Sequence, residues 1–280
     1  MDPKTHGHRE RSLDLWPEAI EAVCRETTLF TRVRVLRETT STQDAAAGLA
    51  PGTIVTAGRQ VAGRGRLGAA WADTGEEGLA VTFILPSLDA ERLGMAAAVA
   101  SAEAIREGLP ADAAARTGIK WPNDIVIVRP DGRFGKLCGV LVERSDRGAL
   151  VGIGVNVRQS AFPSAIADRA VSLAMLGASV DRLEVLLRLV RRMDRWVGAS
   201  EASLSAGYRE LDRTVGLRLR FQTPSGPVEG VVQACEPRRG LGVLTQQGEV
   251  HLPAATTRVD PEPPEGRSTM HASCSAPPAS

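Results

Sequence analysis

The 280-residue sequence contains only four histidines and four cysteines, and only 4% of its residues are aromatic. The histidines lie near the ends of the chain and outside its glycine-rich segments, which argues against nucleophilic catalysis that depends on histidine. The cysteines are isolated from one another and lack the C-x-x-C spacing of zinc sites or the density of a disulfide framework. We therefore expect reduced thiols and no structural metal.

The sequence also lacks an excess of either charge, because 34 Lys and Arg residues oppose 33 Asp and Glu residues and leave a net charge of +1. A nucleic-acid-binding domain is normally basic, so the balance argues against bulk binding of nucleic acid. No apolar run reaches the roughly 18 residues of a membrane span, and the first dozen residues are polar. We expect a cytoplasmic protein with no membrane association.

Apolar and β-branched runs predict more strands than helices. Strands are expected at 33–38, 53–58, 78–85, 124–128, 136–144 and 149–157. Helices are expected over 88–108, from near Ser41, and over 180–212. Turn-like tetrapeptides at 129–132 and 145–148 join successive strands directly, which favours an α+β fold with a mixed sheet over a doubly wound one.

The pattern changes after this region. Short alternating runs between residues 214 and 260, separated by glycine-containing turns, predict a small β-barrel. The proline- and serine-rich tail at 261–280 has no hydrophobic periodicity and is expected to be disordered. The predicted organisation is an N-terminal extension at 1–32, partly helical or disordered, a main domain at 33–213, the barrel and the tail.

A glycine-rich segment, GRQVAGRGRLGAAW at 58–71, lies between two expected strands. Its glycines allow close approach of the backbone to an anion, and Arg64 and Arg66 flank that approach. It is neither a Walker loop nor a dinucleotide fingerprint, since no GK[ST] follows and it does not open a helix. The segment predicts a phosphate or carboxylate clamp, although a flexible surface loop with solvated arginines would give the same pattern.

A second segment, GIKWPNDI at 118–125, presents a cation, an amide and a carboxylate at Lys120, Asn123 and Asp124. Pro122 forces an extended or turned backbone there. A carboxylate near phosphates indicates a hydrated Mg²⁺ ion held by few protein ligands. The alternative is a turn in which Asp124 bonds to its own backbone.

Two strand-like segments carry the other polar candidates. Lys136 stands at the start of the apolar run GKLCGVLVE at 135–143, either facing an anion or extending its ammonium group into solvent. In GIGVNV at 152–157, alternating glycines permit close approach of a ligand or of another part of the chain beside Asn156. Ordinary core packing is the alternative for that segment.

In this order along the chain, ETTSTQDAA at 38–46, GRGRLGAAW, KWPND, GKLCGVLVE and GIGVNV resemble the motifs of the biotin protein ligase family, in its short form without an N-terminal DNA-binding domain. The resemblance extends over residues 33–260. It implies a mixed-sheet α+β catalytic domain of the biotin/lipoate ligase type, followed by an SH3-like barrel. It also implies a ligase that uses ATP and Mg²⁺ to form biotinyl-5′-AMP and then biotinylates a lysine of the biotin carboxyl carrier protein of acetyl-CoA carboxylase.

The resemblance further implies roles for individual residues. The catalytic residues would be Lys136, Arg66 and Asp124, and Asp124 would hold Mg²⁺ or orient the incoming lysine. The biotin-binding set would be Ser41, Thr42, Gln43, Gln60, Gly63, Arg64, Gly65, Arg66, Trp71 and Lys136. The nucleotide-binding set would be Arg64, Arg66, Lys120, Asn123 and Asn156.

The sequence departs from the family pattern at two positions. Gln43 stands in place of the usual Asn, and Ala69 stands where many relatives have a second basic residue, so affinity for biotin or ATP is expected to be weaker than is typical. The other interpretations are a lipoate or octanoate ligase of the same superfamily and a non-catalytic, biotin-responsive regulator. Because only about 32 residues precede the main domain, we expect no operator binding. The oligomeric state stays open, with a homodimer as one option.

Overall fold

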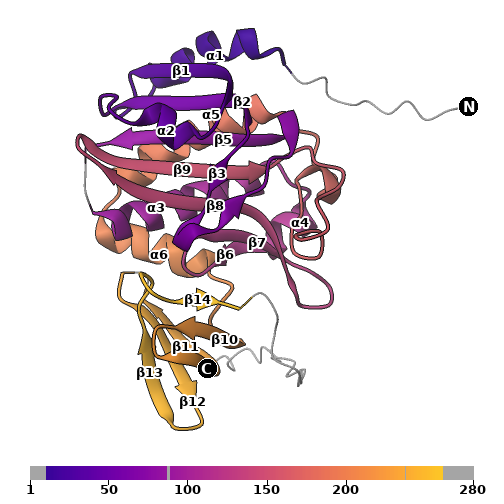
Figure 1. Ribbon diagram of the computed structural model, residues 1–280, viewed down its shortest axis with the longest axis vertical. Helices are drawn as coiled ribbons and strands as arrows, with labels where there is room; N and C mark the ends of the chain where they lie inside the picture. The colour runs from indigo at the N-terminus through magenta and orange to yellow at the C-terminus, as the bar shows by residue number, and fades with distance from the viewer. Residues whose placement is uncertain (1–10, 87–88, 237, 261–280) are drawn as a thin grey trace, which may run out of the picture.

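The computed structural model describes residues 11–86, 89–236 and 238–260. Its main element is a seven-stranded sheet (Figure 1). In spatial order the strands are β1 (Arg32–Thr39), β2 (Thr53–Gln60), β5 (Gly78–Leu85), β9 (Gly148–Asn156), β8 (Phe134–Ser145), β7 (Asp124–Val128) and β6 (Thr117–Lys120). Strands β1 and β2 are parallel and the other neighbours are antiparallel, which confirms the mixed sheet and the α+β class.

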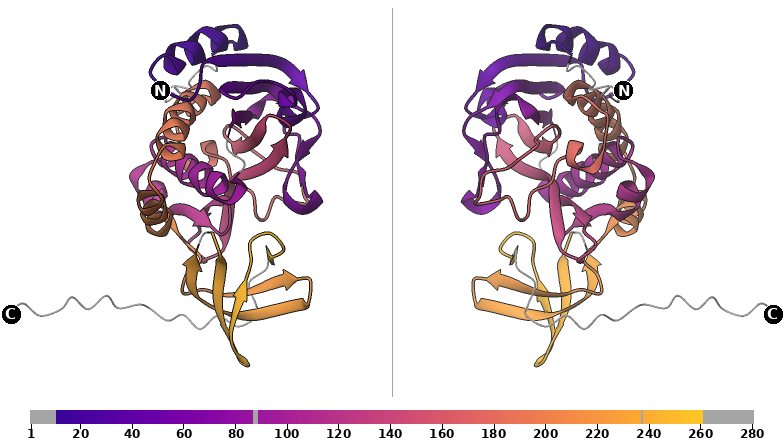
Figure 2. Two further views of the ribbon diagram at one scale, coloured as in Figure 1. Left: turned by 90° about the vertical axis from the view of Figure 1, so that its left-hand side faces the viewer. Right: turned by 90° about the vertical axis from the view of Figure 1, so that its right-hand side faces the viewer.

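The long helices stack along one face of this sheet (Figure 2). They are α1 (Trp16–Cys24), α3 (Ala90–Arg106), α5 (Arg182–Val197) and α6 (Glu201–Leu211), and the six-residue α4 (Ala111–Arg116) contacts α3 and β7. The many alanines of α3 are buried and allow it to pack closely on β8 and β9. Trp16 and Ile20 of α1 belong to the same hydrophobic core, so this helix is part of the main domain's packing.

The prediction of one helix over 180–212 was wrong, because the structure divides this region into α5 and α6. Helix α5 ends at Val197, with Gly198 as its C-terminal cap. Ser200 then accepts a hydrogen bond from the Ser203 backbone amide at 3.2 Å and starts α6. The serine satisfies one of the amide groups that a new helix leaves unpaired, which makes a second start favourable.

The C-terminal segment forms a separate five-stranded antiparallel sheet below the main sheet in Figure 1. Its strands are β10 (Arg218–Thr223), β11 (Gly226–Glu236), β12 (Gly240–Thr245), β13 (Gly248–Leu252) and β14 (Arg258–Val259), in the order β13-β12-β11-β10-β14. The small SH3-like domain is confirmed, but the sheet is open and has β13 and β14 at its two edges. Strand β14 has only two residues, too few to continue the ladder around a closed barrel.

The remaining elements are short. They are helix α2 (Thr42–Ala46), the hairpin strands β3 (Gly63–Arg64) and β4 (Ala70–Trp71), and 3-10 turns at Leu13–Leu15, Arg66–Gly68, Gly75–Glu77 and Ala174–Leu176. No helix among the described residues is both long and apolar enough to cross a membrane. The tail at 261–280, predicted to be disordered, lies outside the described residues.

Candidate active site

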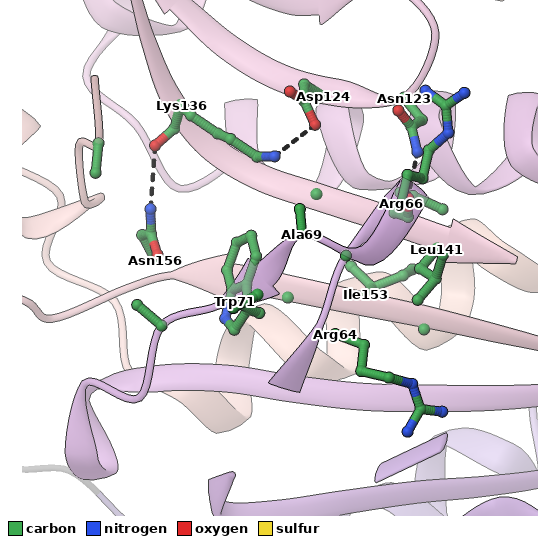
Figure 3. A pocket seen from close by; sticks show the side chains of 18 of the residues that line it. Arg64, Arg66, Ala69, Trp71, Asn123, Asp124, Lys136, Leu141, Ile153 and Asn156 are labelled. Atoms are coloured by element: carbon green, nitrogen blue, oxygen red, sulfur yellow. Dashed lines mark hydrogen bonds and ion pairs between the residues drawn. The ribbon is translucent and has the colours of Figure 1, made fainter. Parts of the chain in front are cut away.

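A cavity of about 450 Å³ lies against β8 and β9, and the β3–β4 hairpin borders it (Figure 3). Its lining combines polar side chains from segments that are far apart in the chain. Of the predicted site residues it includes Ser41, Thr42, Gln43, Gln60, Arg64, Gly65, Arg66, Trp71, Lys120, Asn123, Asp124, Lys136 and Asn156. The five sequence motifs, dispersed over more than a hundred residues, therefore meet in one pocket.

Glycines make the close approach of the hairpin possible. The Trp71 ring lies so near to β9 that a Cβ atom on Gly154 would be 2.7 Å from Trp71 Cε2, and one on Gly139 of β8 would be 3.1 Å from Trp71 Cζ3. The alternating glycines of GIGVNV thus accommodate another part of the chain, as their spacing suggested. At the tip of the hairpin, Leu67 and Gly68 both have positive φ, at 56° and 78°.

The centre of the pocket contains an ion pair. Lys136 Nζ lies 2.7 Å from Asp124 Oδ1, and both side chains are about one-third exposed, at 38% and 30%. The same ammonium group lies 5.6 Å from the centroid of the Trp71 ring. Figure 3 shows the Lys136 and Asp124 side chains directed toward each other across β8 and β7. Lys136 therefore faces the pocket and does not extend into bulk solvent.

Two further predicted cations, Lys120 and Arg66, are partly buried. Burial lowers the pKa of Lys120, although the nearby Asp124 carboxylate opposes this effect. The Lys120 ammonium also lies 5.6 Å from the centroid of the Phe134 ring. Burial likewise lowers the pKa of Arg66, whose guanidinium donates a hydrogen bond to the Ala254 carbonyl of the C-terminal domain. These charges are partly desolvated without a ligand, which increases their attraction for an anion.

The sequence reasoning missed two cations that also line the pocket, Arg169 and Arg258. Arg258 comes from the C-terminal domain and donates a hydrogen bond to the Leu67 carbonyl at the tip of the hairpin. The Arg169 carbonyl accepts a hydrogen bond from the Lys136 amide at 2.7 Å, which places residue 169 beside β8. Neither arginine lies in a recognisable motif, so the sequence offered no signal for them.

Polar residues at the start of α2 form the other end of the pocket. Ser41 caps the helix, and Gln60 Oε1 accepts hydrogen bonds from the Thr42 amide at 2.8 Å and the Thr42 hydroxyl at 3.1 Å. Gln43 Nε2 donates to the carbonyls of Leu141 at 3.4 Å and Leu150 at 3.3 Å. The Gln43 side chain, which is longer than that of the usual Asn, therefore hydrogen-bonds to the pocket walls formed by β8 and β9.

Four predicted residues make different contacts from those that the sequence suggested. Gly63 is absent from the pocket lining and instead allows β3 to approach Gln60 and Trp71. Arg64 pairs with two carboxylates outside the lining. Asn123 donates to the Val140 carbonyl, and Asn156 Nδ2 donates to the carbonyls of Lys136 at 3.1 Å and Val171 at 3.2 Å. Both asparagine amides thus hold the pocket walls together.

The pocket contains one carboxylate suited to a metal ion. Within residues 11–86, 89–236 and 238–260 there is no group of three or more His, Cys, Asp or Glu residues arranged to hold a metal. Mg²⁺ at nucleotide sites is bound by one or two carboxylates, with phosphates and water supplying the other ligands. Asp124, on the cation-lined pocket, fits that role.

Comparisons with known proteins agree with this geometry. The model of the biotin/lipoate A/B protein ligase family matches residues 30–160. The chain is 34% identical over 220 residues to the biotin–[acetyl-CoA-carboxylase] ligase of Mycobacterium tuberculosis, covering 72% of this chain and 79% of that protein. It is 34% identical over 241 residues to the enzyme of the same name from Paracoccus denitrificans, covering 79% and 98%.

A solved structure is similar over a comparable length. The biotin protein ligase from Aquifex aeolicus, in complex with biotin and ATP, superposes with a TM-score of 0.71 at 28% identity, covering 82% of this chain and 99% of that one. Fold and pocket thus define a ligase of the biotin/lipoate class. Within that class, the chain belongs to the biotin protein ligase family.

Proposed function

We propose that this protein is an ATP-dependent ligase that converts biotin to biotinyl-5′-AMP and transfers the biotinyl group to a lysine of a biotin carboxyl carrier protein. The observation that carries the proposal is the Lys136–Asp124 pair at 2.7 Å in a pocket that Arg66, Lys120, Arg169 and Arg258 also line. With Arg64, the lining carries six cations and one carboxylate, which suits a substrate with several negative charges. The names of the two ligase relatives support acetyl-CoA carboxylase as the source of the carrier.

In the first step, a biotin carboxylate oxygen attacks the α-phosphorus of ATP. The new P–O bond forms as the bond to the β-phosphate oxygen breaks, and pyrophosphate leaves. No protein nucleophile is needed, so the work of the protein is to hold the two anions together and stabilise the charge that develops on oxygen. We assign that work to Lys136 and Arg66, with Lys120 on the nucleotide side.

In the second step, the neutral amine of the carrier lysine attacks the acyl carbon of the mixed anhydride. An amide bond forms, the amine loses its proton and AMP leaves. Asp124 is the carboxylate at the centre of the pocket, and we propose that it orients the incoming lysine or holds Mg²⁺. Mg²⁺, when bound there, would neutralise phosphate charge.

Ser41, Thr42, Gln43 and Gln60 would form the biotin end of the pocket, because their side chains are polar and uncharged and lie together at the start of α2. Trp71 would close this end through its packing on Gly154. A cytoplasmic location, where ATP and carrier are both present, belongs to the same proposal. Two expectations from the sequence stay as predictions: that the protein does not bind an operator, and that a homodimer is one option for its oligomeric state.

The test is to incubate the protein with labelled biotin, Mg-ATP and an acetyl-CoA carboxylase carrier domain. We expect label on the carrier, and none on a carrier whose acceptor lysine is replaced by arginine. Label that stays with the protein would indicate a passive binder or a stalled enzyme. Transfer of lipoate or octanoate in place of biotin would instead indicate the other activity of the superfamily.

A further inference from the structure

The β3–β4 hairpin is a two-stranded sheet of its own, separate from the seven-stranded sheet that it partly covers. Backbone bonds of Val61 and Ala62 to Thr39 and Thr40 hold the base of the hairpin, and beyond that base its position over the pocket depends on side-chain contacts. Trp71 supplies one such contact on β9, and the bonds of Arg66 and Arg258 supply two more toward the C-terminal domain. The remaining side of the hairpin faces α2 and β8.

Arg64 connects the hairpin to that side. Its Nη1 lies 2.6 Å from Asp44 Oδ1 on α2, and its Nη2 lies 3.0 Å from Glu143 Oε2 on β8. We call this arrangement of Arg64, Asp44 and Glu143 the Arg64 bridge. The hydrogen bonds to Glu143 and Asp44 raise the pKa of Arg64, which keeps the guanidinium charged.

The bridge determines what Arg64 can contact. Both terminal nitrogens of the guanidinium are engaged by carboxylates, and the side chain extends away from the Lys136–Asp124 pair (Figure 3). By contrast, Arg66 is half-buried, and the Asp124 carboxylate acts on its charge. The two arginines of the glycine-rich segment therefore occupy different environments, although the sequence presents them as equivalent.

We propose that Asp44 and Glu143 are positioning residues that act through Arg64 and hold the hairpin over the biotin end of the pocket. The elements that carry the two carboxylates also carry Gln43 and Leu141, which line that end. The bridge thus fixes the distance between the hairpin and the walls that it faces. Arg64 belongs to this support, and Arg66 is the arginine of the segment that meets the anions.

The first experiment uses the ligand-free chain and does not depend on the proposed function. Amide hydrogen exchange of residues 63–70 is measured in the wild type, Asp44→Asn, Glu143→Gln and the double variant. Exposed ion pairs are individually weak, so we expect exchange to rise about threefold in each single variant and about tenfold in the double variant. Asp112→Asn is the matched control. It removes an exposed ion pair on α4, in which Arg116 Nη2 lies 2.7 Å from Asp112 Oδ2.

Two further measurements distinguish loss of the Arg64 bridge from general loss of structure as the cause of faster amide exchange. Salt screens partly exposed ion pairs, so exchange in the wild type should approach that of the double variant at about 1 M salt, while the double variant changes little. Arg64→Lys should give an intermediate rate, because an ammonium cannot reproduce the fork that contacts two carboxylates. Equal amide exchange rates at 63–70 in the wild type and the double variant would show that the Arg64 bridge does not hold the hairpin.

The second experiment rests on the proposed function and measures biotin affinity by calorimetry. We expect the dissociation constant to rise about tenfold in the double variant and to be unchanged in Asp112→Asn. Increased exchange with unchanged biotin affinity would show that the bridge does not position the hairpin for ligand. If the wild type itself fails to bind biotin, the proposed function is wrong, whereas the exchange experiment still decides whether the bridge exists.

Discussion

At the scale of single residues, the two lysines of the pocket are held in different ways. Lys136 has a carboxylate at 2.7 Å, whereas Lys120 lies in a more buried position beside the Phe134 ring. An ion-pair partner offsets most of the free-energy cost of burying a charge, whereas a desolvated charge destabilises the folded state. The two residues should therefore respond differently to the loss of their charge.

Lys120→Met should stabilise the protein and weaken ATP binding. The pKa of Lys120 in the folded state is lower than the ordinary value of 10.5 that applies to the unfolded chain. Between these two pKa values the unfolded chain therefore binds more protons than the folded state. Stability then rises with pH through that window, and the variant should lose this rise. We expect an increase in Tm of about 2–4 °C, equivalent to ~1 kcal/mol. Calorimetric scans at several pH values check it, with Lys120→Arg as the charged control.

Lys136→Ala should slow adenylation by about 10²- to 10³-fold, as loss of one preorganised charge often does. The ammonium would otherwise neutralise the charge that builds on oxygen as the carboxylate attacks. Biotin-dependent exchange of pyrophosphate into ATP measures this step alone. Arg147→Ala, in the β8–β9 turn, removes an exposed cation as a control, and wild-type exchange in Lys136→Ala would contradict the assigned role.

At the scale of elements, the contact between the hairpin and β9 depends on the absence of a side chain. A methyl group on Gly154 would lie 2.7 Å from Trp71 Cε2, which forces the ring or the hairpin to move. Gly154→Ala should therefore weaken biotin binding by about tenfold or more, with a smaller change in Tm, because the hairpin moves more easily than the sheet. Binding calorimetry and thermal melting together test this difference.

Gly94→Ala is the matched control. Gly94 lies inside α3, and its added methyl group would meet Val142 Cγ2 at 3.9 Å, an ordinary contact. Alanine favours a helix interior over glycine by about 0.5–1 kcal/mol, so this variant should be slightly more stable and should bind biotin normally. Equal biotin affinity in Gly154→Ala and Gly94→Ala would exclude Trp71 from the ligand end of the pocket.

The predicted elements were correct where hydrophobic periodicity is strong and local. The run GLAVTFIL coincides with β5, and the alanine-rich helix expected over 88–108 is α3. Strand β6 was missed because its four residues, TGIK, are too short to show alternation. The division between α5 and α6 was missed because the apolar spacing continues past Gly198, and the cap at Ser200 outweighs it.

Prediction of the site residues was likewise restricted to those that a sequence motif contains. Lys120, Asp124 and Lys136 were singled out by local patterns, Ser41 and Gln60 by the resemblance to the family's motifs, and all five line the pocket. Arg258 could not, because its place in the pocket depends on how the small C-terminal sheet lies against the hairpin. Nor could the local pattern distinguish Arg64 from Arg66, since their partners come from α2, β8 and the C-terminal domain.

At the scale of the whole molecule, deletion of 261–280 should leave the melting temperature and the rate of carrier biotinylation nearly unchanged. This tail is rich in proline and serine and has no periodic apolar residues, a composition from which we expect little buried surface. The truncation retains Ala254 and Arg258, which contact the hairpin. A fall in Tm of many degrees would show that the tail packs on the C-terminal sheet.

The bonds of Arg66 to Ala254 and of Arg258 to Leu67 join positions separated by 188 and 191 residues. Because domains fold from the N-terminus during synthesis, the main sheet and its helices are complete before the residues that hold the hairpin tip have left the ribosome. A chain that ends prematurely before residue 254 lacks both bonds. The direction of translation thus makes this enclosure the last part of the pocket to form, and restricts it to chains that have been synthesised beyond residue 258.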